Sequence, residues 1–196
     1  MAPASSQHAN KEPSKSDSEP FLHNLFEGEL APLGLEPNPG ALSAETVRTM
    51  LDTRTAAVPG ELTPLRRNLL EGLLLLWHGH WDAAHSVAQD REGDPDFDLL
   101  HALAHRREGD FGNSAYWFGG AGKHPCYAWL ENLPAEAWPG GENDLRRDLM
   151  PKGRWSYTAF IAEIKKAPRR DRDRDRQLRE LQKLEFLAFA RWILDG

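Results

Sequence analysis

The fold is decided by residues 63–125, which read TPLRRNLLEGLLLLWHGHWDAAHSVAQDREGDPDFDLLHALAHRREGDFGNSAYWFGGAGKHP. Thr63 precedes Pro64, and this pair typically caps and begins a helix. Leucines then recur at helical spacing as far as Gly79, and a similar run follows Pro95. We expect Asp96 or Asp98 to cap the third helix of this stretch and Asp110 to cap the fourth. The stretch predicts four helices joined by short loops, over residues 63–79, 81–90, 97–108 and 112–121.

The four predicted helices form two similar pairs. A shift of 30 residues aligns Leu69 with Leu99, Leu70 with Leu100, Leu73 with Leu103, Trp81 with Phe111, Ala84 with Ser114, Gly79 with Gly109, and Pro95 with Pro125. In each pair leucines would fill the inner face of the first helix, a glycine would make the turn, and a small residue would allow close approach. The repeat therefore predicts two stacked antiparallel helical hairpins.

The sequence of the second predicted hairpin resembles that of a known repeat family. Residues 109–125, GDFGNSAYWFGGAGKHP, are similar to the second half of a tetratricopeptide (TPR) repeat, although the period of 30 is shorter than the usual one of about 34 residues. This resemblance covers residues 63–125 and implies helical hairpins that present a binding groove. The sequence of residues 101–118 also resembles that of an uncharacterised group of bacterial proteins. This second resemblance implies no activity.

The flanking segments complete an all-α prediction. Residues 1–19 contain no large apolar residue after Met1, so we expect a disordered tail, followed by a single helical domain over residues 20–196. Further helices are predicted over residues 43–54, 127–130, 144–150 and 155–167. A long C-terminal helix is predicted within residues 169–196, where leucines recur at three-to-four spacing, and we expect it to pack against the hairpins. No segment alternates for long enough to predict a strand.

Composition excludes several classes of protein. The net charge of −6 argues against a nucleic-acid partner. The longest apolar run, Leu73–Trp77, is far shorter than the roughly 20 residues that a membrane span needs. The one cysteine, Cys126, excludes an internal disulfide framework and favours a reducing compartment, so the cytoplasm is the expected location. The sequence does not specify the oligomeric state.

Histidines are concentrated in the predicted hairpins. Six of the eight lie between residues 78 and 124. His101, His105 and Glu108 share one face of the third helix, and His85 lies on the neighbouring helix. Imidazoles and a carboxylate in this arrangement predict a site for a divalent metal, with Zn, Fe, Mn or Ni as candidates. The H-x-x-x-H spacing is a weak signal by itself, and the sequence favours the alternative that these histidines are structural and bond to the main chain or to carboxylates.

A second set of residues predicts a ligand-binding surface. Arg106 or Arg107 could clamp a carboxylate or phosphate, although the sequence favours an ion pair with Glu108, Asp110 or a neighbouring helix. Tyr116 and Trp117 are candidates for contact with a ligand or partner because three consecutive aromatic residues cannot all face a core. Asn113 would line the same groove.

Three functions remain open at this level. The first is a binding module that holds a protein, a peptide or a small anionic molecule in a groove formed by the residues just named. The second is a metal-dependent enzyme that carries out hydrolysis or oxygen chemistry with the histidine cluster. The third is a structural scaffold without a site. The helical repeat favours the first, although a fold by itself does not define a function.

Overall fold

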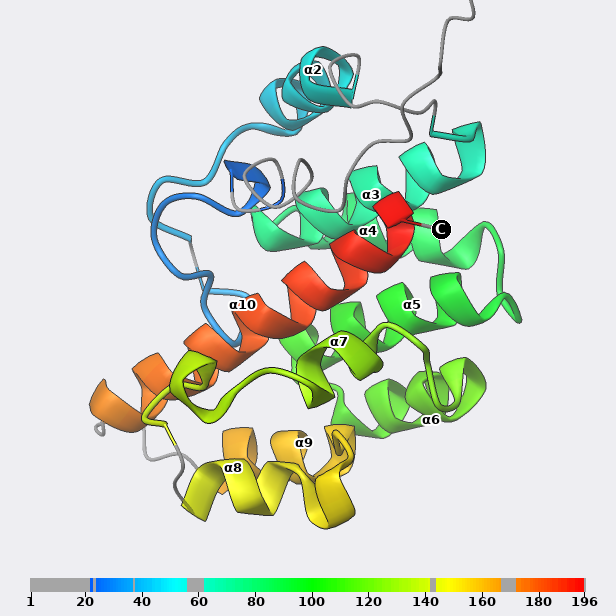
Figure 1. Cartoon of the computed structure of the whole chain (residues 1–196). Helices are drawn as coiled ribbons and strands as arrows, with labels where there is room; N and C mark the ends of the chain where they lie inside the picture. Colours follow the sequence, from blue (N-terminus) through cyan, green and yellow to red (C-terminus); the bar gives the residue numbers. More distant parts are fainter. Residues whose placement is uncertain are drawn as a thin grey trace, which may run out of the picture.

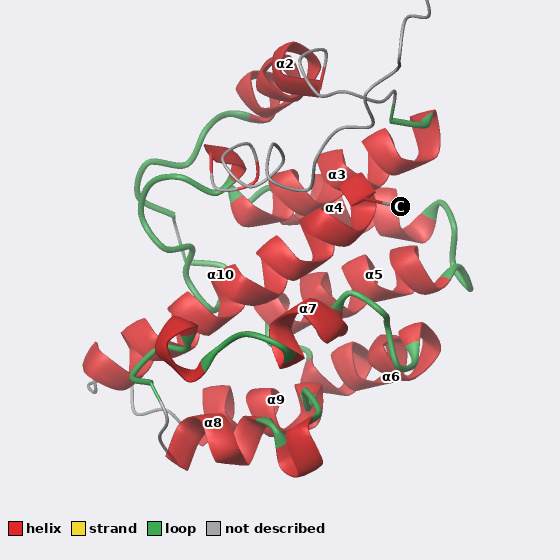
Figure 2. Ribbon diagram, viewed as in Figure 1, coloured by secondary structure: helices red, strands yellow, loops and turns green. Residues whose placement is uncertain are grey.

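In the computed structural model, the described part of the chain, residues 22, 24–36, 38–55, 62–141, 144–166 and 172–195, contains α-helices and no strand (Figure 2). The helices run, in chain order, α2 (Ala44–Thr55), α3 (Pro64–Trp77), α4 (Trp81–Gln89), α5 (Pro95–Glu108), α6 (Phe111–Ala121), α7 (Tyr127–Glu131), α8 (Asp144–Leu149), α9 (Tyr157–Lys166) and α10 (Arg172–Asp195). The predicted fold class is confirmed. The disordered tail predicted for residues 1–19 lies outside the described residues. Among the helices described, none combines the length and the apolar character that crossing a bilayer requires.

Helices α3 and α4 form one hairpin, and α5 and α6 form the next (Figure 1). Each turn contains a glycine with positive φ, 84° at Gly79 and 88° at Gly109, a conformation that costs glycine little. Residues related by the shift of 30 have matching environments, since Ala84 and Ser114 are both fully buried. The predicted pair of hairpins is thus confirmed, and the long helix α10 lies across them.

Most of the predicted helix caps are confirmed, and one is wrong. Thr63 accepts a hydrogen bond from the backbone N–H of Arg66, and Asp110 caps α6 in the same way. Helix α5, however, is capped by Asp94 and not by Asp96 or Asp98. The reason is that Pro95 occupies the first helical position, where its missing N–H costs nothing. The capping residue is therefore Asp94, which directly precedes Pro95. Asp98 instead accepts a hydrogen bond from the backbone N–H of Gly93 at 2.9 Å.

Helix α5 is the most deeply enclosed element. Every residue from Phe97 to Arg107 is buried, because α3, α4 and α6 pack around the helix. This stretch includes two histidines and two arginines, so the sequence places strongly polar side chains where water cannot solvate them. Each such group needs a partner inside the protein.

Arg107 finds its partners at the carboxyl end of α3. Its guanidinium group donates to the carbonyl oxygens of Leu76 and Gly34, while the side-chain amide of Asn38 donates to Trp77 O at 3.1 Å. The last carbonyls of a helix have no partner within the regular helical pattern and carry partial negative charge. A cation at this position supplies a hydrogen-bond donor and compensates the negative charge. Burial, together with the nearby charge of Arg106, lowers the pKa of Arg107 to about 10.

The turn after α3 holds the segment before α2. His78 Nδ1 accepts the N–H of Leu42 at 3.2 Å, and His80 Nε2 donates to the carbonyl oxygen of Leu42 at 2.8 Å. Burial is the main cause that lowers the pKa of His78 to about 4, so this ring is neutral at pH 7. Both rings therefore form hydrogen bonds to the main chain, which is the structural role that the sequence offers as the alternative to metal binding.

Arg106 points to the other helices. It lies 2.5 Å from Glu185 of α10, and both side chains are almost fully buried. The hydroxyl of Tyr127 donates to the second oxygen of the same carboxylate at 3.2 Å, and the guanidinium lies 4.8 Å from the ring centre of Phe160. One buried ion pair thus connects α5 with α7, α9 and α10.

We predict that Glu185→Gln lowers the free energy of unfolding by about 3 kcal/mol or more, because Arg106 is left as an uncompensated buried charge. Urea unfolding followed by circular dichroism measures the change. Glu180→Gln on the same helix is the matched control, since Glu180 is partly exposed and forms a long pair with Arg176 at 3.9 Å. That control should cost less than about 0.5 kcal/mol. Equal losses in the two variants would contradict the assigned role of the pair.

Candidate metal centre

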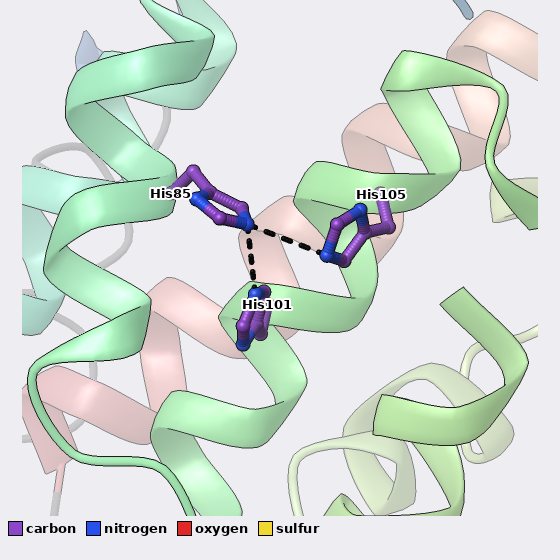
Figure 3. Close-up of side chains that lie close together, drawn as sticks. All are labelled: His85, His101 and His105. Atoms are coloured by element: carbon purple, nitrogen blue, oxygen red, sulfur yellow. Dashed lines mark hydrogen bonds between the residues drawn. The ribbon is translucent and has the colours of Figure 1, made fainter. Parts of the chain in front are cut away.

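Three imidazole rings meet between α4 and α5. His101 Nε2 lies 2.9 Å from His85 Nε2, and His85 Nε2 lies 3.3 Å from His105 Nε2. Figure 3 shows the three rings directed at one another, one from α4 and two from α5. One ring nitrogen from each histidine lies within 4.8 Å of the other two, so the group could hold a metal ion. The expectation that His85 approaches His101 and His105 is confirmed.

Local sequence explains why the rings converge. His101 and His105 are separated by one helical turn and project from the same face of α5. On α4 the buried residues are Ala84 and Ala88, whose small side chains let this helix lie close to its neighbours. His85 follows Ala84 directly and is half-buried, at the border of the contact. Helix packing therefore brings all three rings to one point.

The three histidines cannot all form conventional hydrogen bonds to one another. A ring nitrogen of histidine carries either one proton or one in-plane lone pair, so it forms one conventional hydrogen bond. His85 Nε2, however, has two nitrogen neighbours at hydrogen-bonding distance. Only one of these contacts can be a conventional hydrogen bond at a time, whichever tautomers are present. The other is then a weaker contact that shares the same proton or lone pair. A cation, in contrast, would accept a lone pair from each of the three nitrogens.

Glu108 lies on the outer side of the cluster. Its carboxylate accepts a hydrogen bond from His105 Nδ1 at 2.8 Å. This contact places the proton of His105 on Nδ1 and leaves the lone pair on Nε2, which faces the other two rings. The sequence predicts Glu108 as a metal ligand, but the structure places it beside the nitrogen that points away from the cluster. Its geometry is that of a carboxylate that orients a ligating histidine.

His105 and Glu108 also lie close to Asp110, and these three could in principle hold a cation. Both carboxylate oxygens of Asp110 are already used, however. One accepts the backbone N–H of Asn113 at 3.0 Å and the other its side-chain amide at 2.8 Å. The hydrogen bond from the Asn113 backbone is the first cause that lowers the pKa of Asp110. Capping of α6 therefore accounts for Asp110.

Two tryptophans stack on the histidines. The ring of Trp81 lies parallel to His85, with centroids 4.6 Å apart, and Trp117 lies parallel to His101 at 4.0 Å. Trp81 is itself anchored, since its indole N–H donates to the carbonyl oxygen of Ala104 at 2.9 Å. Sequence reasoning did not assign Trp81 to the site. The available signal was its spacing, because residues 81 and 85 are one helical turn apart.

The environment disfavours the charged form of two of the rings, His101 and His85. Burial, followed by the neighbouring rings of His85 and His105, lowers the pKa of His101 to about 4. The pKa of His85 is also lowered, first by burial and then by His105. Neutral imidazoles have free lone pairs at pH 7, which is the state that a metal ion requires.

The residues predicted to form a ligand-binding groove do not come together. Arg106 and Arg107 are each about 1% exposed and face internal partners. Asn113 is exposed at the start of α6, and Tyr116 is 70% exposed on the same helix. Trp117 is half-buried against His101. A groove that combines the arginines with Tyr116 is therefore not formed in the described structure, and ligand binding by these residues stays a prediction.

A comparison of the chain with known protein families, with curated proteins and with solved structures finds no match. The resemblance to TPR repeats is thus supported only at the level of consecutive helices packed as hairpins.

We predict that His101 in the metal-free protein stays neutral down to about pH 4, in contrast to an ordinary histidine at about 6.5. NMR titration of protein with labelled histidine rings measures this directly. His85→Gln should move the titration of His101 upward, because it removes one neighbouring charge. A His101 ring that titrates near pH 6.5 in the folded protein would show that the ring is solvated and the cluster open.

Proposed function

We propose that this protein binds a divalent transition-metal ion through the Nε2 atoms of His85, His101 and His105. The observation that carries this proposal is the convergence of three imidazole nitrogens that cannot all form conventional hydrogen bonds to one another at the same time. A bound cation would accept a lone pair from each ring and remove the conflict. The site would join α4 to α5, so binding would also stabilise the fold.

The spacing of the nitrogens supports this proposal. Two imidazole nitrogens bound to one tetrahedral Zn²⁺ at about 2.0–2.1 Å are about 3.3 Å apart. The separations of 2.9 and 3.3 Å around His85 are close to that value in the metal-free cluster. Small ring movements would suffice to admit an ion.

Zn²⁺ is the first candidate because three imidazoles and an outer carboxylate suit it, while Cu²⁺ would bind such nitrogens more tightly in a direct competition. An ion held by three histidines can retain one exchangeable ligand, and Zn²⁺ in that state lowers the pKa of bound water to about 7. Hydrolysis or oxygen chemistry at the site is compatible with this arrangement and stays a prediction.

A peptide- or anion-binding module, which the TPR resemblance favours, has less support. Its predicted arginines are buried in internal contacts, and of its aromatic residues only Tyr116 is strongly exposed. Metal binding is therefore the function that the described residues support best.

We predict that protein purified without a polyhistidine tag, stripped with chelator and titrated with Zn²⁺ binds about one ion per chain. Binding should raise the free energy of unfolding by about 2.7 kcal/mol at a free Zn²⁺ concentration 100 times Kd. Calorimetry, elemental analysis and thermal unfolding measure these quantities. His101→Ala should weaken binding by about 100-fold or more, because one of the three ligands is lost.

The matched control is His80→Gln, since His80 lies outside the cluster and contacts the main chain of Leu42. This variant should bind Zn²⁺ with wild-type affinity. Less than about 0.2 ion per chain in the wild-type protein at saturating Zn²⁺ would overturn the proposal, and so would equal affinity in His101→Ala.

We also predict that Glu108→Ala weakens Zn²⁺ binding by about 10- to 100-fold, because His105 loses the partner that fixes its tautomer and orientation. Glu108→Gln should lose less, since its amide oxygen can still accept the hydrogen bond from Nδ1. Glu180→Ala on α10 is the control and should leave the affinity unchanged. If Glu108→Ala and Glu180→Ala bind equally well, the carboxylate has no part in the site.

A further inference from the structure

The three histidines of the cluster are not held in the same way. His105 has a carboxylate on its outer nitrogen, the arrangement usual for a ligating histidine. His101 Nδ1, in contrast, is buried and makes no hydrogen bond to the described residues. A ring without such a bond could rotate about its χ angles and turn its Nε2 away from the cluster. The contact of Nε2 with His85 at 2.9 Å is then the one hydrogen bond of this ring to the described residues, and it fixes only one end of the ring.

Stacking restrains the rest of the His101 ring. The indole of Trp117 lies 4.0 Å from the ring of His101, with an angle of 20° between the planes. The ring of His105 is also parallel to His101, at 4.8 Å and 21°. Of these contacts the one with Trp117 is the closer. Aromatic rings in van der Waals contact resist rotation because a turn of either ring collides with the other.

We propose that Trp117 is the positioning residue of the metal site, which holds His101 Nε2 toward the ion. This inference rests on the proposed function. It reassigns Trp117 from contact with an external ligand to support of a metal ligand, and it makes α6 a third helix that shapes a centre formed by α4 and α5. Trp117 does for His101 what Glu108 does for His105.

Trp117 is itself held in place. It follows Tyr116, whose ring meets it edge-on at 5.1 Å, and it lies one residue before Phe118, which is 1% exposed. Ser114 on the same helix donates to the carbonyl oxygen of Ala102 at 2.9 Å. These contacts fix α6 against α5, so the indole is presented to His101 by a rigid element.

The experiment compares Trp117→Phe and Trp117→Leu after loading with Co²⁺, whose visible d–d bands report the geometry of a nitrogen site. Phenylalanine retains a flat ring that can stack, while leucine retains bulk without one. We expect Trp117→Leu to weaken Co²⁺ and Zn²⁺ binding by about 10- to 100-fold and to change the d–d spectrum. Trp117→Phe should retain an affinity within about threefold of that of the wild type and should have the wild-type spectrum.

Trp129→Leu is the matched control, because Trp129 is also half-buried but lies on α7 beside Arg191. It should leave the affinity and the spectrum unchanged. Urea unfolding of each metal-free variant shows whether it is folded under the binding conditions. If Trp117→Leu destabilises the chain too far, Trp117→Phe, with a flat ring, is compared with Trp117→Met, whose flexible side chain fills irregular space without a ring.

The outcomes separate this inference from the proposed function. No Co²⁺ binding by the wild-type protein would overturn the metal site itself. Normal binding by wild type, with unchanged affinity and spectrum in folded Trp117→Leu or Trp117→Met, would overturn the role of Trp117 alone. Equal losses in the phenylalanine and leucine variants would also overturn it, because stacking would then not be the property that matters.

Discussion

The burial of α5 on every side between Phe97 and Arg107 is the constraint on which the rest of the structure depends. A helix in this position usually consists of apolar residues, because a buried polar group costs free energy unless it finds a partner. This helix instead carries His101, His105, Arg106 and Arg107 in its last two turns. The neighbouring helices have to supply a partner for each of them, and the arrangement of the hairpins around α5 shows how this is done.

The two arginines find their partners in ways that hold the fold together. Arg107 reaches the carboxyl end of α3, where the carbonyls carry partial negative charge, and so attaches the segment around Gly34 to the hairpins. Arg106 pairs with Glu185 and so fixes the long C-terminal helix against α5. Buried ion pairs add little net stability by comparison with apolar contacts, but breaking one is costly. Loss of either partner of the Arg106–Glu185 pair would therefore destabilise the contact between α5 and α10.

The histidines of α5, unlike its arginines, do not find a complete set of partners. His101 and His105 both contact His85 Nε2, which can form only one conventional hydrogen bond. Glu108 fixes one ring, Trp117 and Trp81 restrain the other two, and the convergence at His85 Nε2 remains unresolved by hydrogen bonding. A metal ion is the simplest species that would satisfy all three nitrogens. The centre lies where two helices of different hairpins meet, so metal binding and the packing of α4 on α5 would reinforce each other.

The sequence by itself determined the helices, because Thr63, Asp110, Gly79 and Gly109 act through local geometry that needs no distant partner. It also determined the clustering of His101 and His105, since residues four apart share a helix face. Its error at the cap of α5 was local too, because Pro95 took the first helical position. Only the tertiary structure decided that Glu108 supports His105 from outside, that Trp117 covers His101, and that both arginines are internal. These contacts join residues on different helices or depend on which nitrogen of a ring faces a neighbour, and helical periodicity carries no information about either.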